Sequence, residues 1–298
     1  MLALAAVVSG LVAYTQHTVE IAGTPRASAE AALEAYQARS LAAAIAEPFT
    51  TVDGTGMGAI LQSGDELPVQ YGSRPAPGVS LQLKWVDGSE HICTTGPAVI
   101  GSSSYREGIV TAAHCGTDVR AVSMQTSPDP AARLPMAGVL FPKREPLAPA
   151  GAVRIDTSLI LSSRSLDSSA VRIARRWPVA GALKEEVARK LRPFSTQLCI
   201  NGTVSGVSCG MVVPTDEDNL RFLARSKPGD SGSTVFLIDA STQMAILVGV
   251  LSAGAGGTSI ATFLEPALTR MNVKAMVDEG AAAIYRDDPR LSDEVSPQ

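Results

Sequence analysis

The sequence predicts an all-β protein, on three observations. From Val79 onward, short apolar runs recur along the chain, several of them alternating with polar residues, and Gly, Pro, Asn and Asp separate them. Long helical patterns do not regularly intervene, which is typical of a sandwich or barrel rather than of an α/β fold. Aromatic residues make up 4% of a chain that is 45% hydrophobic, so the core must consist mainly of Val, Leu, Ile and Ala.

The individual strands are predicted from these runs. The clearest covers 79–86, where side chains alternate up to the turn pair Asp87-Gly88. The other strands are predicted at 98–101, 108–112, 159–161, 206–213, 234–238 and 245–251. Residues 182–191 are compatible with a helix or with a loop excursion, and 265–279 predicts a C-terminal helix. Residues 120–151, which contain several prolines, are expected to form a surface excursion.

Changes in composition divide the chain into four regions. Residues 1–29 are interpreted as a signal peptide, because their apolar run is shorter than the roughly 20 residues that span a bilayer, and Ala27-Ser28-Ala29 is a candidate cleavage site. The basic residues that usually precede such a run are missing, so either the start is wrongly assigned or the signal is atypical. A buried N-terminal helix or an uncleaved anchor is the alternative interpretation. Residues 30–78 are interpreted as a linker or short propeptide, or as an extension that packs on the main domain. Residues 79–285 are the predicted main domain, and 286–298 a polar, frayed tail.

Four cysteines lie beyond the apolar N-terminal run, at Cys93, Cys115, Cys199 and Cys209. An even number of cysteines in an exported chain predicts two disulfides. Three pairings are open, of which Cys93–Cys115 with Cys199–Cys209 is the most local. The chain has no C-x-x-C pair, so the cysteines do not suggest a zinc site.

Two short motifs contain the candidate catalytic residues. Thr111-Ala-Ala-His114-Cys115 places a histidine after an apolar run, and Gly229-Asp-Ser231-Gly232 places a serine in a glycine-flanked loop. A serine hydroxyl needs an adjacent imidazole to take its proton before it becomes a useful nucleophile. The chain has three histidines, so His114 has few rivals as that base.

A carboxylate must hold the imidazole in the right tautomer. Asp156 is the best candidate, because it opens an apolar run and lies between His114 and Ser231 in the sequence. A buried aspartate is costly unless it is hydrogen-bonded, and orienting a histidine would satisfy it. Asp167, in a serine-rich loop, is the rival candidate.

The glycines of the second motif predict a site for an oxyanion. Gly229 lets the backbone turn so that its N–H can point toward a developing negative charge, and the Ser231 N–H is expected to point the same way. Removing one such donor typically costs about 100- to 1,000-fold in rate. Gly-Asp-Ser-Gly alone is only moderately specific, because loops often contain these residues. Together with the His114 motif in the right order, it predicts acyl transfer.

The order His, Asp, Ser, with these two motifs, resembles the chymotrypsin-like serine proteases. The bacterial branch that contains the streptogrisins and alpha-lytic protease is the closer match, because residues 199–210 follow its Cys-x-x-Gly-x-x-x-Gly-x-x-Cys-Gly pattern and Pro228 precedes the serine motif. The resemblance covers roughly residues 79–275. It implies two packed six-stranded antiparallel β-barrels with the active site in the cleft between them.

The resemblance also implies residue roles. His114 is the general base, Asp156 its orienting partner and Ser231 the nucleophile, and the N–H groups of Gly229 and Ser231 form the oxyanion hole. Residues 249–254 resemble the strand that pairs with a bound peptide.

Within that strand, Ser252, Ala253 and Gly254 are the expected substrate-binding residues, because an added strand is held through main-chain hydrogen bonds. Ser252 is also expected to hydrogen-bond Asp156.

Two positions depart from the pattern of that branch. Arg225 stands six residues before Ser231, where that branch often has a cysteine, and 255–260 contain no partner cysteine, so no disulfide links this pocket wall. Arg225 is either a substrate-binding residue that favours an acidic side chain or a solvated loop residue. Ser233 replaces the commoner glycine after Gly232.

The sequence therefore predicts an exported serine endopeptidase, secreted or in the cell envelope, that cleaves peptides or proteins through an acyl-enzyme. No metal or organic cofactor is expected. The net charge of −4, without clustered Lys and Arg, gives no nucleic-acid footprint. One alternative is a protease-fold binding protein with weak or no catalysis, and another is an esterase with the same three residues. A membrane tether is expected only if the N-terminal segment stays uncleaved.

Overall fold

The computed structural model describes residues 70–298, apart from 147–152, 215–218 and 256. The predicted signal region 1–29 and most of region 30–78 lie outside these residues. The described residues all belong to the larger of two units of the chain, which spans 47–298. None of the helices in this described part is long and apolar enough to cross a membrane.

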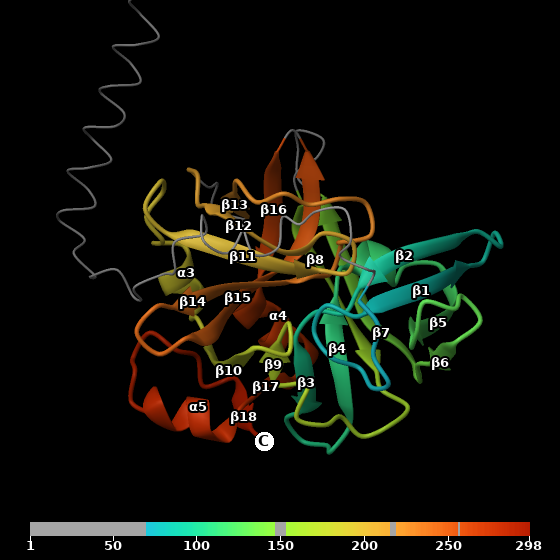
Figure 1. Cartoon of the computed structure of the whole chain (residues 1–298), viewed down its shortest axis with the longest axis horizontal. Helices are drawn as coiled ribbons and strands as arrows, with labels where there is room; N and C mark the ends of the chain where they lie inside the picture. Colours follow the sequence, from blue (N-terminus) through green and yellow to red (C-terminus); the bar gives the residue numbers. More distant parts are fainter. Residues whose placement is uncertain (1–69, 147–152, 215–218, 256) are drawn as a thin grey trace, which may run out of the picture. The chain divides into compact units, whose positions relative to one another are not determined.

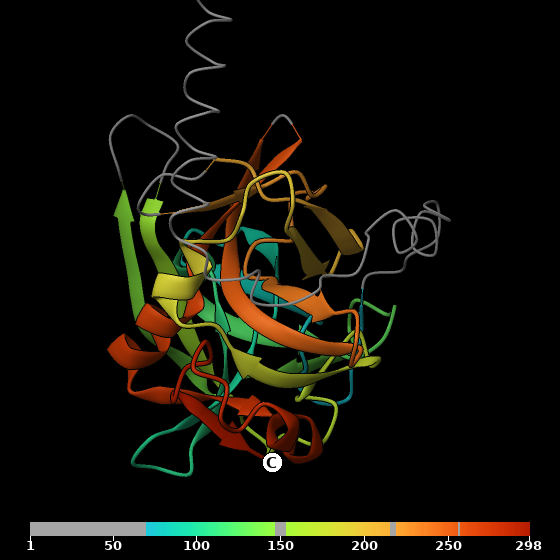
Figure 2. The same cartoon turned by 90° about the vertical axis from the view of Figure 1, so that its left-hand side faces the viewer.

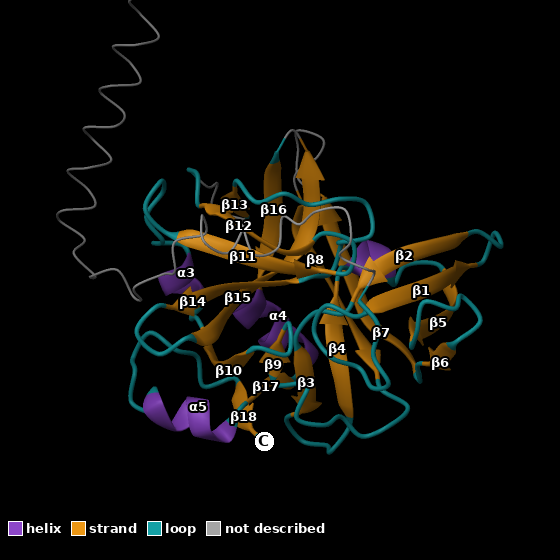
Figure 3. Ribbon diagram, viewed as in Figure 1, coloured by secondary structure: helices purple, strands orange, loops and turns teal. Residues whose placement is uncertain are grey.

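Strands dominate the described part of the chain (Figure 3). Those up to the middle of the sequence are β1 (Ser80–Trp85), β2 (Glu90–Thr94), β3 (Ala98–Gly101), β4 (Glu107–Thr111), β5 (Val119–Gln125), β6 (Arg133–Pro135), β7 (Gly138–Pro146) and β8 (Val153–Leu161). Those that follow are β9 (Arg172–Ile173), β10 (Trp177–Ala182), β11 (Gln197–Gly202), β12 (Gly206–Met211), β13 (Leu220–Phe222), β14 (Thr234–Asp239), β15 (Met244–Ala255), β16 (Thr258–Phe263), β17 (Val273–Val277) and β18 (Val295–Pro297). The helices are the 3-10 turn η1 (Ala113–Cys115), α3 (Glu185–Ala188), α4 (Leu264–Met271) and α5 (Glu279–Ile284).

The described strands form three sheets. One has the order β2-β1-β5-β6, and a second has the order β18-β17-β3-β4-β8-β7. The third is built on β12-β11-β14-β15-β10-β9, with β16 beside β15 and β13 beside β16. The predicted all-β class and the C-terminal helix are confirmed. The six-stranded barrels that the resemblance implied are present as open sheets of four, six and eight strands.

Two strands of the six-stranded sheet, β4 and β8, are buried on both faces. Ile109 and Ile160 pack into a core shared with β1 and β5, whereas Val110, Leu159 and Leu161 pack into a core shared with β14 and β15. Figure 1 shows β4 and β8 between these two groups of strands. Close packing on both faces leaves the two strands little freedom to move relative to each other. Residues carried by β4 and β8 are therefore held in a fixed relation.

The helix predicted over 265–279 is only half correct. The helix α4 ends at Met271, and Asn272 follows it in the left-handed conformation with φ 52° and ψ 50°. Val273–Val277 then forms strand β17, which pairs antiparallel with β3. Tertiary pairing thus overrides a helical pattern that was ambiguous over its second half.

The prediction of a frayed tail over 286–298 is wrong. Val295–Pro297 pairs parallel with β17, and the buried Ser292 donates its main-chain N–H to the oxygen of Ala182. Figures 1 and 2 both show α5, β17 and β18, drawn in red, beside one another near the C-terminus. The polar residues of this segment hid its backbone pairing, which gives no compositional signal.

The surface excursion expected over 120–151 is also wrong in its described part. The segment contributes most of β5 and all of β6 and β7, and these strands pair with β1, with β5 and with β8 respectively. Among its described prolines, Pro128 and Pro130 lie in the connection between β5 and β6, Pro135 and Pro146 end β6 and β7, and Pro142 lies where the β7–β8 register shifts.

Residues 70–78, the described end of the region 30–78, pack on the main domain. The Gln70 side chain donates to Asn201 Oδ1 at 2.8 Å and to the Gly202 oxygen at 2.9 Å. Asn201 is fully buried and donates to the Pro77 oxygen at 3.0 Å. These nine residues therefore pack on the main domain, and whether 30–78 is an extension or a propeptide stays a prediction.

Candidate active site

His114 is held where β4 ends and the chain turns. The turn η1 follows β4, and its other two residues, Ala113 and Cys115, are buried. Cys115 forms a disulfide with Cys93 at the end of β2, which ties the turn to the neighbouring sheet. The His114 side chain is 31% exposed, so the imidazole is anchored on one side and open on the other.

Asp156 lies in β8 and is bonded to His114 at two points. Its Oδ2 accepts from His114 Nδ1 at 2.7 Å, and its Oδ1 accepts from the His114 main-chain N–H at 2.9 Å. The Asp156 side chain is 1% exposed. An ionised carboxylate only accepts hydrogen bonds, so Nδ1 carries the proton and Nε2 is left as an acceptor. This is the tautomer that a general base for a serine hydroxyl requires.

The rival carboxylate, Asp167, lies elsewhere. Its Oδ2 is 3.4 Å from Nε of Arg74, and both side chains are 44% exposed. Its Oδ1 accepts from the main-chain N–H of Ser169 at 3.0 Å. Asp167 is thus a solvated turn residue, and Asp156 is the aspartate that the fold brings to His114.

Ser231 lies in the loop between β13 and β14, in a turn that two glycines make possible. Gly229 has φ 102° and Gly232 has φ 90°, which side chains rarely tolerate. A Cβ on Gly232 would lie 2.0 Å from Thr111 Oγ1, so the loop sits directly on the end of β4. The Ser231 main-chain oxygen lies 3.9 Å from Cys115 Sγ, beside the disulfide.

The two candidate oxyanion donors are both unengaged. Among the described residues, neither the Gly229 N–H nor the Ser231 N–H has an acceptor, whereas the N–H groups of Asp230, Gly232 and Ser233 all do. Two N–H groups that are available close to a candidate nucleophile are what oxyanion binding requires.

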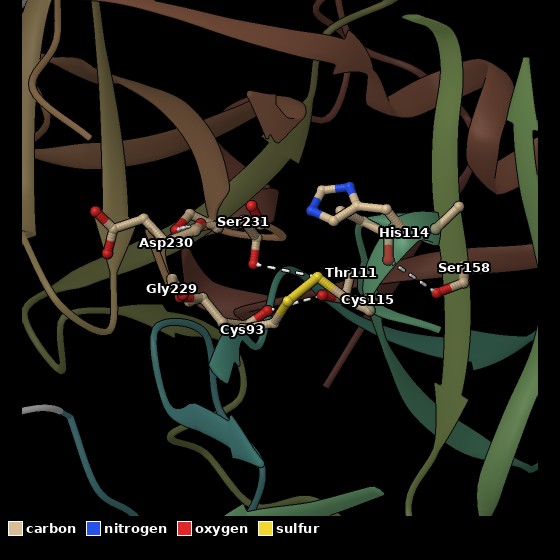
Figure 4. The surroundings of a disulfide bond; sticks show 12 residues. Cys93, Thr111, His114, Cys115, Ser158, Gly229, Asp230 and Ser231 are labelled. Carbon is tan, nitrogen blue, oxygen red and sulfur yellow. Dashed lines mark hydrogen bonds between the residues drawn. A yellow bond between two sulfur atoms is a disulfide. The ribbon is translucent and has the colours of Figure 1, made fainter. Parts of the chain in front are cut away.

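The His114 ring points toward Ser231 (Figure 4). In the described part of the chain, the Ser231 hydroxyl makes no hydrogen bond to that ring. Catalytic hydrogen bonds are often long in substrate-free enzymes and shorten when substrate binds. The fold therefore brings Asp156 into direct contact with His114, whose ring faces Ser231.

Asp230 is a structurally central residue to which the sequence reasoning gave no role. Its fully buried carboxylate accepts three main-chain N–H groups, from Val204 and Ser205 at Oδ1 and from Lys227 at Oδ2. These bonds attach the Ser231 loop to the turn between β11 and β12. A Cβ on Gly202 would lie 2.3 Å from Asp230 Oδ1, which explains one glycine of the 199–210 pattern. An aspartate directly before the candidate serine was a visible but unused signal.

The expected peptide-binding strand has a free edge. Ala253 and Gly254 pair with Ile260 and Ser259 of β16, while β14 pairs with β15 only up to Val250. Leu251 still exchanges hydrogen bonds with Gly232 and Ser233, so within the described residues this edge of β15 is without a partner only beyond Leu251. An extended peptide could add to such an edge through main-chain hydrogen bonds.

The hydrogen bond expected between Ser252 and Asp156 is not formed. The Ser252 hydroxyl is buried and has no partner in the described structure. The β15–β16 register shifts between Leu251 and Ala253, which places Ser252 in a bulge, and both Asp156 oxygens are already bonded to His114. This expectation is therefore wrong, and the register shift at Ser252 is the local feature that the sequence did not predict.

Arg225 is exposed and lies in the loop that leads to Ser231. Its main-chain N–H donates to Ser208 Oγ at 2.9 Å. Within the described residues its guanidinium has no ion-pair partner, which fits the solvated interpretation, and its role in substrate binding stays a prediction.

Both local disulfides are present. Cys199 and Cys209 are opposite each other in the β11–β12 hairpin, and Cys93–Cys115 joins β2 to η1. The sulfurs of Cys93 and Cys115 and a ring nitrogen of His114 lie within 4.8 Å of one another, a proximity that the sequence did not reveal. Thiolates, not disulfide sulfurs, bind metals, so the oxidised pair offers no such ligand.

No protein-family model and no curated protein matches the chain. The structure is similar to solved serine proteases. For Thermobifida fusca protease A the identity is 18% and the TM-score 0.44, over 68% of this chain and 98% of that chain. Cellulomonas bogoriensis chymotrypsin is 19% identical with a TM-score of 0.41, and the match covers 68% of this chain and 98% of that chain. A glutamic acid-specific serine protease is 18% identical with a TM-score of 0.43, and the match covers 67% of this chain and 100% of that chain. Because these TM-scores are below 0.5, we base the proposed function on the geometry of this chain.

Proposed function

We propose that this protein is a serine endopeptidase in which His114, Asp156 and Ser231 form a catalytic triad. The observation that supports it most is the pair of hydrogen bonds from His114 to Asp156, with the His114 ring turned toward a serine whose flanking N–H groups are free. A buried carboxylate that holds a partly exposed imidazole in one orientation is what a general base requires.

The proposed reaction follows from these positions. His114 Nε2 takes the proton of the Ser231 hydroxyl as its oxygen attacks the substrate carbonyl carbon. The resulting oxyanion lies against the N–H groups of Gly229 and Ser231. The C–N bond then breaks, and His114 returns the proton to the leaving amine. Water, deprotonated by His114, attacks the acyl-enzyme, and the Ser231 oxygen leaves with the proton from His114.

The substrate class is proposed to be extended peptide segments of proteins. The free edge of β15 at Ser252–Gly254 suits a peptide strand, which gives affinity through the main chain and leaves selection to side chains. Arg225, exposed in the loop that leads to Ser231, is then available to a substrate side chain.

An exported location is proposed on the two disulfides. Disulfides persist in oxidising compartments and are rare in the cytosol. All four cysteines of the chain are paired in this way. Secretion or the cell envelope is thus the proposed location, with residues 1–29 as the exporting signal.

Hydrolysis of a quenched-fluorescent peptide library by the mature protein tests the proposal. We expect cleavage by the wild type and none above background by Ser231→Ala or His114→Ala. A matched ester panel separates a peptidase from an esterase. Wild-type protein that is folded, as shown by a cooperative melt, and cleaves neither panel would instead support the non-catalytic binding protein.

A further inference from the structure

Thr94, the last residue of β2, makes an unusual number of contacts with the Ser231 loop. Its side chain is fully buried. Its main-chain N–H donates to the Ser231 oxygen at 2.8 Å, and its hydroxyl donates to the Gly229 oxygen at 2.8 Å. Thr94 therefore binds the main-chain oxygens of both Gly229 and Ser231, the two residues proposed to bind the oxyanion.

The direction of the hydroxyl bond is fixed by its second partner. The Thr203 N–H donates to Thr94 Oγ1 at 3.0 Å, and an amide N–H can only donate. The single hydroxyl proton of Thr94 is thus left for the Gly229 oxygen. The Thr94 carbonyl accepts from Thr111 Oγ1 at 2.9 Å, so neighbouring strands also hold Thr94 itself.

These bonds act on the peptide groups around the candidate oxyanion donors. The Ser231 N–H belongs to the peptide group between Asp230 and Ser231. The peptide group before it is held through the Gly229 oxygen, and the one after it through the Ser231 oxygen. The central group is held at the Asp230 oxygen, which accepts from the Ser233 N–H at 3.0 Å and from the Ser233 hydroxyl at 2.5 Å. Three consecutive peptide groups are therefore fixed.

We propose that Thr94 is a positioning residue for the oxyanion site, and that its hydroxyl, by holding the Gly229 oxygen, fixes the backbone that lies between the Gly229 and Ser231 N–H groups. This inference rests on the proposed serine peptidase function and adds a residue to it. Thr94 touches neither substrate nor the reacting atoms. It acts through the Gly229–Ser231 backbone. In the low-dielectric interior, losing a hydrogen bond costs more free energy than it does in water.

Thr94→Val tests the inference, because valine keeps the shape and removes only the hydroxyl. Thr95→Val is the matched control. Thr95 is equally buried, and its hydroxyl bonds only to Ala76 and Val79, away from the Ser231 loop. Both variants lose a buried hydroxyl network, so both lose stability.

The kinetic expectation separates positioning from stability. Thr94→Val lowers kcat about 10- to 100-fold with KM changed less than about twofold, because a small misplacement of a catalytic donor costs up to about 100-fold. Thr95→Val keeps kcat within about threefold of the wild type, and Thr94→Ser restores most of the loss. Equal kcat values in Thr94→Val and Thr95→Val would overturn the inference.

A second measurement does not depend on catalysis. Hydrogen–deuterium exchange over 229–233 is expected to be at least about tenfold faster in Thr94→Val than in Thr95→Val, because the held peptide groups are released. If the wild type cleaves nothing, the proposed function fails, while faster exchange in Thr94→Val still supports the positioning role. Unchanged exchange over 229–233 contradicts that role whatever the activity.

Discussion

Asp156 holds His114 by its main chain and by its ring at once. The carboxylate accepts from the His114 N–H at 2.9 Å and from Nδ1 at 2.7 Å, and it is nearly inaccessible to water. The bond to the main-chain N–H fixes the position of the His114 backbone, and the bond to Nδ1 fixes the orientation of its ring. The tautomer and the orientation of the imidazole therefore depend on one buried side chain of β8.

Asp156→Asn is expected to lower kcat by about 10⁴-fold while the protein stays folded. An amide in place of the carboxylate can stabilise the wrong tautomer of His114 and cannot support an imidazolium. Asp167→Asn is the control, because Asp167 is the exposed rival that contacts Arg74 instead. Steady-state kinetics on a peptide substrate measure both variants. A similar loss in the two variants, or none in Asp156→Asn, would contradict the assigned role.

Gly232→Ala is expected to destabilise the protein by several kcal/mol, of which about 1–3 kcal/mol is backbone strain. The remainder is steric, since the new Cβ would lie 2.0 Å from Thr111 Oγ1 and 2.5 Å from the Thr94 oxygen. Gly88→Ala isolates the strain alone, because Gly88 has φ 89° and no atom within 4 Å of a Cβ. Urea denaturation gives both free energies of unfolding. Equal losses would show that the contact with β2 and β4 is unimportant.

Removing the Cys93–Cys115 disulfide by a double serine substitution is expected to cost about 3 kcal/mol of stability. The two cysteines are 22 residues apart, and breaking their disulfide increases the conformational entropy of the unfolded chain. The Cys199–Cys209 pair, 10 residues apart, is the comparison. At temperatures where both variants are folded, we expect loss of Cys93–Cys115 to lower kcat and loss of Cys199–Cys209 to leave it unchanged. The reason is that Cys115 adjoins His114. Full activity without Cys93–Cys115 would contradict this coupling.

Tyr285 is expected to make stability fall in alkaline solution. Burial, together with the hydrogen bond to Asp239 at 2.7 Å and the charge of Asp239, raises the pKa of Tyr285 from 10.0 to about 12. Above pH 10 the unfolded chain loses the phenol proton that the folded chain keeps, so the folded state binds more protons. The contribution is complete below pH 10 and is lost as the pH rises through 12.

The measurement is the free energy of unfolding of wild type and Tyr285→Phe at several pH values from 8 upward. The difference between the two proteins is expected to shrink from about pH 10 toward pH 12. A constant difference would show that Tyr285 ionises in the folded protein as it does in the unfolded one, and a growing difference would show that folding lowers its pKa; either result would contradict the prediction.

The parts of the fold that were predictable are those in which side-chain chemistry and backbone pairing agree. The strand at 98–101 was predicted with its observed limits, since short apolar runs between turn residues allow few alternatives. Val273–Val277 was mistaken for helix, because its strand identity depends on pairing with β3, far away in the sequence. The docking of Val295–Pro297 depends likewise on β17 and not on its own residues.

The residues of the candidate site also differ in whether the sequence alone could identify them. His114, Asp156 and Ser231 were identifiable because the chemistry restricts their residue types and their order. Thr94 was not, because a threonine at a strand end has many ordinary uses and only the folded backbone shows what its hydroxyl contacts. The bulge at Ser252 was equally invisible, since register shifts between paired strands leave no signal in one strand alone.

Stoichiometric labelling with a fluorophosphonate probe tests the central claim most directly. Such a probe reacts covalently with a serine only when a base activates it and an oxyanion site receives the phosphonyl oxygen. We predict one label per mature wild-type molecule, located on Ser231 by peptide mass spectrometry, and none on Ser231→Ala or His114→Ala. A folded wild type that takes no label, or takes it on another residue, would contradict the account.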